Sequence, residues 1–210
     1  SGFFRSLMNS VIVVGCSCFF NCVIASMAAY GFEKKHFWGK EFLFKVYMLT
    51  LMIPGQVTMI PVFIIMKKLG LLNTYFALVV IILNAFGVFL IRQFMESVPD
   101  ELLEAAKVDG CPEYKIFINI VIPLIKPVLV SLVVFTFVTS WNDFMWPLVS
   151  TTDSSMYTLT VALSLLKTQY QTNYGLILAG ATVSFIFPFI LYAFLQKQFV
   201  EGIALSGVKG

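Results

Sequence analysis

Long apolar runs alternate with short polar intervals along this chain. Five runs fall in the window of about 17–25 residues with which a helix crosses the hydrocarbon core of a bilayer. They occupy residues 11–30, 46–66, 75–91, 127–148 and 175–195. The pattern predicts an all-α, polytopic membrane protein in which residues 1–210 form a single transmembrane domain.

The composition of the chain is that of a membrane protein. Of the 210 residues, 59% are hydrophobic and 12% are charged, whereas soluble domains carry about 25% charged residues. The net charge is only +3, and no run of basic residues occurs, which argues against a nucleic acid as partner. We therefore expect a lipid bilayer as the surrounding of this chain.

The basic residues are distributed unequally between the polar intervals. Alternate intervals lie on opposite sides of the membrane, and one set holds ten of the 14 Lys and Arg residues. Because basic loops are retained on the cytoplasmic side, this set is predicted to be inside, with the N-terminus outside and the C-terminus cytoplasmic. The inside set comprises residues 31–45, 92–126 and 196–210, and the outside set residues 1–10, 67–74 and 149–174.

One polar interval, residues 97–126, has more local detail than a connector needs. Ser97, Pro99 and Asp100 predict a helix start, with a capping hydroxyl, an early proline and an acid near the positive end of the helix dipole. Gly110 is predicted to end this helix in the left-handed conformation. A second helix is expected to follow, and prolines interrupt it where the chain becomes continuously apolar.

A spaced motif lies inside this interval: E-A-A, three residues, Gly, nine residues, then I-x-x-P. It resembles the EAA loop of the membrane-spanning subunits of ATP-binding-cassette (ABC) importers, with Ile122 where the family usually has Leu. In that family the loop is a coupling helix that docks into a cleft on the ATPase subunit. The alternative is an ordinary cytoplasmic connector. The resemblance implies as coupling residues Glu104, Ala105, Ala106, Asp109, Gly110, Ile120 and Pro123.

Shorter matches resemble the sugar-importing permeases of the maltose-permease type. The resemblance implies a carbohydrate substrate, a heterodimer with a second permease subunit, two ABC ATPase subunits, an extracytoplasmic solute-binding protein and a bacterial inner membrane. It also implies six spans, so that this chain would be missing the first. Gly207 and Lys209 would contact the ATPase, unless the tail is a solvated end. The matches are Asn9–Ser10, Ala28–Tyr30, Ile53–Pro54, Leu69–Tyr75, Trp141–Asn142 and Gly207–Gly210.

The sequence contains no pattern for nucleotide binding or hydrolysis. The phosphate-binding loop G-x-x-x-x-G-K-[ST] and the H-E-x-x-H and G-x-S-x-G motifs do not occur. We therefore expect no enzymatic activity, no metal and no cofactor in this chain, with ATP and Mg²⁺ on the partner ATPase. The lone His36 is expected to be solvated. The cysteines are expected to pack as buried thiols; they are Cys16, Cys18, Cys22 and Cys111.

A few polar residues inside the apolar runs are candidates for the substrate pathway or its gate. Pro54 and Pro61 predict a kinked second span, which leaves open whether Gln56 lines a pathway or the kink only shapes packing. Asn142 and Asp143 lie near the end of the fourth span, where a carboxylate marks either function or an interface position. Two tryptophans of this stretch, Trp141 and Trp146, lie at the depth of an aromatic belt.

Two other functions compete with that of a sugar-importer subunit. A permease of an ABC importer for a non-sugar solute has the same coupling motif. A stand-alone channel or secondary transporter would favour an internal repeat and ionisable groups at mid-membrane. No repeat occurs, and Asp143 is the one charge inside any predicted span, so the importer subunit is the favoured hypothesis.

Overall fold

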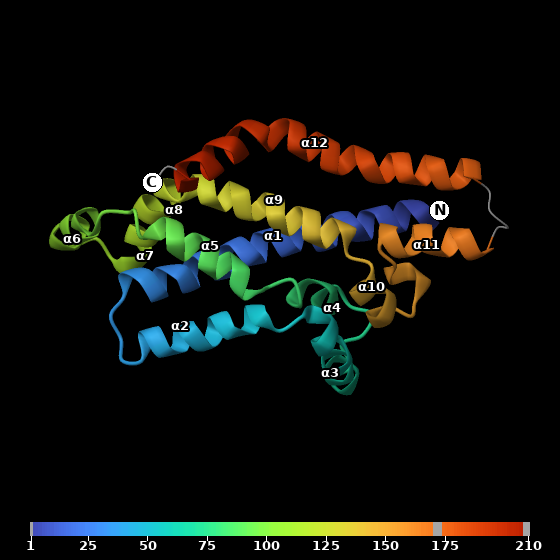
Figure 1. The fold of residues 1–210 in the computed structure, drawn as a ribbon, viewed down its shortest axis with the longest axis horizontal. Helices are drawn as coiled ribbons and strands as arrows, with labels where there is room; N and C mark the ends of the chain where they lie inside the picture. The colour runs from blue at the N-terminus through green and yellow to red at the C-terminus, as the bar shows by residue number, and fades with distance from the viewer. Residues whose placement is uncertain (1, 170–173, 208–210) are drawn as a thin grey trace. The chain divides into compact units, whose positions relative to one another are not determined.

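The computed structural model describes residues 2–169 and 174–207, and all regular structure within them is helical. The chain forms two compact units, and Figure 1 shows its helices in chain order by colour. Helix α1 (Gly2–Lys34) and helix α9 (Lys126–Asn142) each contribute to both. Unit 1 comprises Ser1–Phe19, Pro54–Ile82 and Phe135–Gln196, and unit 2 comprises Phe20–Ile53, Leu83–Val134 and Lys197–Gly210.

The remaining elements are mostly short helices. The longest of them is α12. They are α2 (Lys40–Leu49), α3 (Gly55–Lys68), α4 (Tyr75–Val80), α5 (Ala85–Met95), α6 (Asp100–Val108), α7 (Glu113–Ile116), α8 (Ile122–Leu124), α10 (Met145–Ser150), α11 (Leu159–Gln169) and α12 (Tyr174–Gly207), with 3-10 turns at Thr50–Met52 and Ser154–Met156 and a π-helical segment at Phe117–Val121.

Within the described residues, α1 is long and apolar enough to cross a membrane by itself. Two bent helix pairs pass the same test when each is taken together, which gives up to three candidate spans if each pair is one span. The first pair bends by 101° between Met52 and Gly55, and the second bends by 76° between Leu124 and Lys126. The kink predicted at Pro54 is therefore confirmed, and α5 and Leu178–Phe194 are further apolar helices of shorter length.

Two predicted spans are interrupted beside polar side chains that accept hydrogen bonds from the backbone of the next helix. The third apolar run breaks after α4, and the Asn84 side chain accepts a hydrogen bond from the backbone N–H of Phe86 at 3.0 Å to start α5. The fourth run breaks after α9, and an oxygen of Asp143 accepts from the N–H of Trp146 at 3.5 Å in α10. These side chains offer the backbone local partners that compete with a continuous helix.

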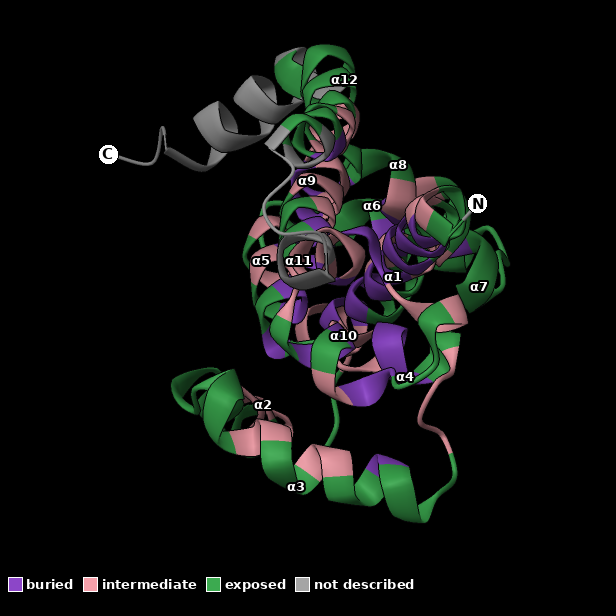
Figure 2. Cartoon of the chain, turned by 90° about the vertical axis from the view of Figure 1, so that its right-hand side faces the viewer, coloured by how far each residue is buried: buried purple, intermediate pink, exposed green. Residues whose placement is uncertain are grey.

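In unit 2, helices α1, α5 and α9 pack closely around one apolar cluster. Its fully buried members include Ala25, Ile91 and Leu132. Gly87 makes the close approach possible, since a Cβ there would lie 3.2 Å from atoms of Ala25, Asn21 and Leu132. Helices α2 and α3, by contrast, are mostly exposed (Figure 2). Helix α2 has no buried residue, and α3 has one, Met66.

The two tryptophans of α9 and α10 are core residues of unit 1, each 4% exposed. The indole N–H of Trp141 donates to the carbonyl of Ser184 at 3.1 Å, and that of Trp146 donates to the carbonyl of Ala77 at 2.8 Å. Both rings pack inside the chain with their donors satisfied. Their membrane depth, at the level of an aromatic belt, stays a prediction.

Candidate functional site

Helix α6 is the first helix of the coupling segment, residues 97–126, in unit 2. It projects beyond α5 and α7 (Figure 1). Pro99 is the N-cap residue, and Asp100 and Glu101 place two carboxylates in the first turn, where the helix dipole favours negative charge. The prediction that Ser97 caps this helix was wrong. Its hydroxyl donates back to the carbonyl of Phe94 at 2.7 Å, because the chain is still closing the end of α5 at that point.

The C-terminal end of α6 is a Schellman turn. Gly110 has φ 76°, its N–H donates to the carbonyl of Lys107 at 3.0 Å, and the N–H of Cys111 donates to the carbonyl of Ala106 at 2.9 Å. This pair of bonds is the defining feature of the motif. The left-handed glycine predicted from the sequence is confirmed, and α7 then starts at Glu113.

Helix α6 has one buried and one exposed face. Leu103 and Ala106, one turn apart, are 4% and 8% exposed and belong to the unit 2 core. The opposite face is open and combines acid with small and apolar groups; Val108 is 88% exposed. We refer to this as the docking face, and it consists of Glu101, Glu104, Ala105 and Val108.

The residues of the motif therefore have different surroundings. Glu104, Ala105 and Asp109 are exposed, as a docking surface requires. Ala106 does not share their face, since a residue at this position of the helix turns toward the core beside Leu103. The motif also includes Gly110 at the turn, the partly buried Ile120 packed on the core, and the exposed Pro123 in α8.

Two consecutive lysines, the last residue of α1 and the one that follows it, contact the start of α6 and the start of α7. The Lys34 ammonium donates to a carboxylate oxygen of Asp100 at 2.8 Å and to the carbonyl of Val98 at 2.6 Å. The Lys35 ammonium and the Tyr30 hydroxyl both donate to the carboxylate of Glu113. These contacts were missed by the sequence reasoning, which counted the lysines only as topology signals.

The carboxylates of these pairs respond to their partners. The hydrogen bond from Lys34 and its positive charge lower the pKa of Asp100. The hydrogen bond from Lys35, followed by that from Tyr30, lowers the pKa of Glu113. Both acids are therefore charged at neutral pH in the folded protein, and both ion pairs persist there.

A third ion pair uses the residue that precedes the two lysines. Glu33 accepts from the Nε–H of Arg92 in α5 at 2.9 Å, and the same guanidinium donates to Glu41 of α2 at 3.2 Å. The Arg92 guanidinium also lies over the ring of Phe44, 3.8 Å from its centroid, which is the geometry of a cation–π contact. Arg92 thus links α1, α2 and α5.

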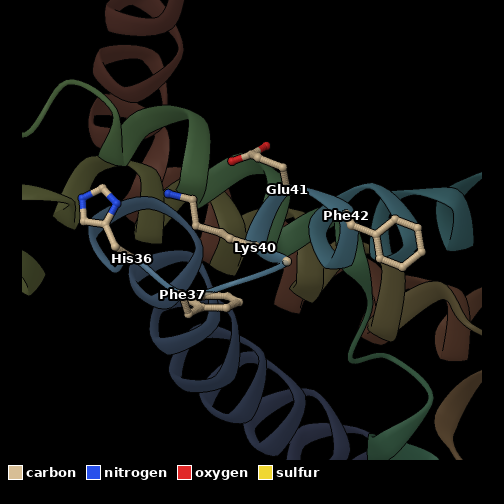
Figure 3. A pocket seen from close by; sticks show the side chains of 6 residues that line it. His36, Phe37, Lys40, Glu41 and Phe42 are labelled. Atoms are coloured by element: carbon tan, nitrogen blue, oxygen red, sulfur yellow. The ribbon is translucent and has the colours of Figure 1, made fainter.

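A shallow hollow of about 550 Å³ lies between the end of α1 and the start of α2. Figure 3 shows the side chains of His36, Lys40, Glu41 and two phenylalanines spread around it, with no convergence on a common point. His36 is exposed, which confirms the expectation that it is solvated. The hollow carries no arrangement typical of a ligand site.

The candidate pathway residues are either exposed or hydrogen-bonded to nearby backbone groups. Gln56 is exposed in the first turn of α3. The side-chain amide of Asn142 donates to the carbonyl of Val138 at 2.8 Å in its own helix, and the Asp143 carboxylate accepts from the N–H of Trp146 at 3.5 Å. The structure does not gather them into one site, and their role in a pathway stays a prediction.

Asn73 ties two polar intervals of unit 1 together. It has φ 58°, its side-chain oxygen accepts from the N–H groups of Thr152 and Asp153 at 2.7 and 3.0 Å, and its amide donates to the Thr152 hydroxyl at 3.0 Å. Both intervals are among those predicted to lie outside. No sequence motif pointed to this contact, although Asn is a residue that tolerates positive φ.

The remaining predicted sites have mixed outcomes. Cys16, Cys18 and Cys22 are partly buried against the cores, whereas Cys111 is exposed, so its assignment as a buried thiol was wrong. Cys111 is exposed because it directly follows the exposed turn at Gly110. The tail position Gly207 ends α12. Lys209 lies outside the described residues.

Comparisons with known proteins agree on one family. Residues 22–204 match the model of the binding-protein-dependent transport system inner membrane component. The arabinooligosaccharides transport system permease protein AraQ of Halalkalibacterium halodurans is 38% identical over 99% of this chain and 74% of its own length. The lactose transport system permease protein LacG of Rhizobium radiobacter is 35% identical over 96% and 74%.

A further relative and a solved structure extend the comparison. The diacetylchitobiose uptake system permease protein DasC of Streptomyces coelicolor is 31% identical over 99% of this chain and 76% of its own length. A bacterial ABC transporter involved in the import of the acidic polysaccharide alginate has a chain that superposes with a TM-score of 0.74. That match covers 100% of this chain and 76% of the other at 23% identity, and it confirms the all-α permease fold.

Proposed function

The chain belongs to the family of binding-protein-dependent transport system inner membrane components, and on this premise we propose that it is the permease subunit of an ABC importer for a carbohydrate. It forms half of the translocation pathway, and a second permease subunit forms the other half. The names of three relatives support the substrate class, since they refer to arabinooligosaccharides, lactose and diacetylchitobiose. A non-sugar solute is the alternative for the same architecture.

The observation that carries the coupling role is the docking face of α6. A helix with only Leu103 and Ala106 buried is held out from the core, which suits a partner cleft that receives its other face. Glu101 and Glu104 offer carboxylates to basic groups of the ATPase, since charge-assisted hydrogen bonds are the strong ones at such contacts. Ala105 permits close approach, and Val108 adds apolar area.

ATP hydrolysis takes place on the partner subunits. The sequence lacks a phosphate-binding loop, so ATP and Mg²⁺ bind to two ABC ATPase subunits. The chain itself responds to the conformational change of those subunits. Gly110 sets the angle between α6 and the helices that follow, because its left-handed turn fixes where the chain reverses. Movement of the docked ATPase is thereby imposed on the coupling segment.

The proposed orientation places the coupling segment in the cytoplasm and the two intervals joined by Asn73 outside. The positive-inside distribution of Lys and Arg supports this orientation. An extracytoplasmic solute-binding protein would then deliver its ligand to the side of the membrane where Asn73 and Thr152 connect the loops. The C-terminal tail, with Gly207 and Lys209, lies on the ATPase side.

Co-purification of the ATPase with the membrane complex tests this function. Glu104→Lys reverses a charge on the docking face and is expected to release the ATPase, whereas Glu104→Gln keeps shape and hydrogen bonding and is expected to be milder. The matched control is Glu96→Lys, since Glu96 is an exposed acid at the end of α5 and lies off the docking face. Equal retention of the ATPase by all three variants would refute the docking role of α6.

A further inference from the structure

Three consecutive residues, the last two of α1 and the one that follows it, each pair with a different helix. Glu33 accepts from Arg92 of α5, Lys34 donates to Asp100 of α6, and Lys35 donates to Glu113 of α7. The three partners are the last basic residue before α6, the first residue of α6 and the first residue of α7. The C-terminal end of α1 thus contacts the chain before α6, the start of α6 and the start of α7.

The two side chains of the Lys34–Asp100 pair differ in burial, and they therefore have different roles. The Lys34 side chain is 5% exposed while that of Asp100 is 71% exposed. A buried ammonium needs its partners, and Lys34 has two of them, the carboxylate of Asp100 and the carbonyl of Val98. Lys34 is therefore the immobile partner of the pair. Its ammonium holds the N-terminal end of α6 through the backbone carbonyl of Val98 and the side chain of Asp100.

The start of α7 is held in the same manner by Lys35, the residue after Lys34. Glu113 accepts hydrogen bonds from Lys35 and from Tyr30 in the last turns of α1. The Lys35 ammonium also lies 4.9 Å from the centroid of the Tyr30 ring, a distance typical of a cation–π contact. Glu113 is the first residue of α7, so this contact fixes the chain on the far side of the turn at Gly110 from α6.

We propose that Glu33, Lys34 and Lys35 are positioning residues that fasten the coupling segment to α1, so that displacement of α6 by the ATPase moves the first span with it. The proposal rests on the function proposed above. Helix α6 buries only two side chains in the core, so apolar packing alone holds it weakly. The ion pairs at the start of α6 and at the start of α7 make α6 and the end of α1 move as one element.

A purely structural role is the competing explanation. The carboxylates of Asp100 and Glu113 are 71% and 47% exposed, and exposed ion pairs contribute little to folding. Their loss should leave the complex folded and assembled while loosening the link between α6 and α1. The discriminating quantity is therefore the number of substrate molecules taken up per ATP hydrolysed, measured on complexes that retain the ATPase.

Charge reversal and charge exchange at Lys35 and Glu113 provide the test in the complete reconstituted transporter. Lys35→Glu and Glu113→Lys singly are expected to lower uptake per ATP by about fivefold or more, the lower end of typical coupling between sites. The exchange Lys35→Glu with Glu113→Lys restores the attraction and is expected to recover most of the coupling. The control is Lys45→Glu, at an exposed lysine of α2 to which the described part of the chain gives no ion pair.

Normal uptake per ATP in both single variants would overturn the proposal, as would an exchange variant no better than the single ones. If reversal prevents assembly, Lys34→Met and Lys34→Arg decide instead. The arginine keeps a donor for Asp100 and should couple better than the methionine, and equal coupling by both overturns the proposal. Glu104→Lys in the same preparation tests docking separately: retention of the ATPase there refutes the proposed function itself, whatever the Lys35 variants do.

Discussion

Replacing Gly110 by alanine tests how the coupling helix is terminated. With φ at 76° and no atom within 4 Å of where a Cβ would lie, the new methyl group meets no clash, and the cost is purely conformational. The left-handed region costs an L-residue about 1–2 kcal/mol. Alanine also restricts the unfolded chain, which returns about 0.4–1 kcal/mol. The net expected destabilisation is about 1 kcal/mol.

Two further substitutions sharpen this expectation. Gly110→Asn should cost less than alanine, because asparagine visits the left-handed region more readily. Gly110→Pro should cost most, since proline fixes φ near −65° and removes the N–H that bonds to Lys107. The matched control is Gly31→Ala, at a helical glycine of α1 whose Cβ position is also free, where alanine should stabilise by about 0.5–1 kcal/mol.

The assay is thermal unfolding of the purified complex in detergent, followed by helical circular dichroism, with uptake measured on the same preparations. The order of stability expected at position 110 is Gly, Asn, Ala, Pro, and uptake should follow the same order. An alanine variant at 110 that is as stable as the one at 31 would refute the left-handed turn and the reasoning built on it.

Three further predictions follow from the same structure. Ala105→Trp should leave unfolding unchanged but block ATPase co-purification, whereas Ala106→Trp should overpack the core and destabilise the protein by about 1–3 kcal/mol. Trp146→Phe should cost about 1–3 kcal/mol in thermal unfolding, because a buried carbonyl of α4 loses its donor. The contact between Lys35 and Glu113 should weaken in acid, because the pKa of Glu113 is lower in the folded protein than its ordinary value of 4.5. The stabilisation that the charged Glu113 gives to the fold is therefore full above pH 4.5 and is lost as the pH falls through the lower folded pKa. Hydrogen exchange across α7 should detect this loss.

Each of these has an outcome that contradicts it. Equal stability of the two tryptophan variants would mean that α6 has no buried face. Trp38→Phe is the control for Trp146, since Trp38 is 99% exposed and its replacement should be neutral within about 0.5 kcal/mol. Exchange protection in α7 that increases on acidification would have the wrong sign for a carboxylate whose pKa is lowered.

The sequence predicted best those features that the backbone decides locally. The left-handed turn at Gly110 follows from glycine alone, and the carboxylates of Asp100 and Glu101 favour a helix start wherever the chain lies. The break at Pro54 follows from a missing N–H. Such signals depend on neighbours in the chain, and they therefore survive without any knowledge of the tertiary fold.

Features that depend on distant partners were missed or misassigned. The face of α6 that carries Ala106 is decided by the core, not by the size of alanine. The burial of Trp146 was missed because its partner, the carbonyl of Ala77, lies 69 positions away. The contact of Lys34 with Asp100 spans 66 positions, and nothing in the sequence pairs those two charges among the others available.

The most direct test of the central claim is uptake and ATP hydrolysis measured together on one reconstituted complex of this chain with its second permease, ATPase and binding protein. We expect a carbohydrate ligand of the binding protein to stimulate hydrolysis and to be taken up, and Glu104→Lys to abolish both while the permease pair still assembles. Full transport by the Glu104→Lys complex, or transport by this chain without an ATPase, would contradict it.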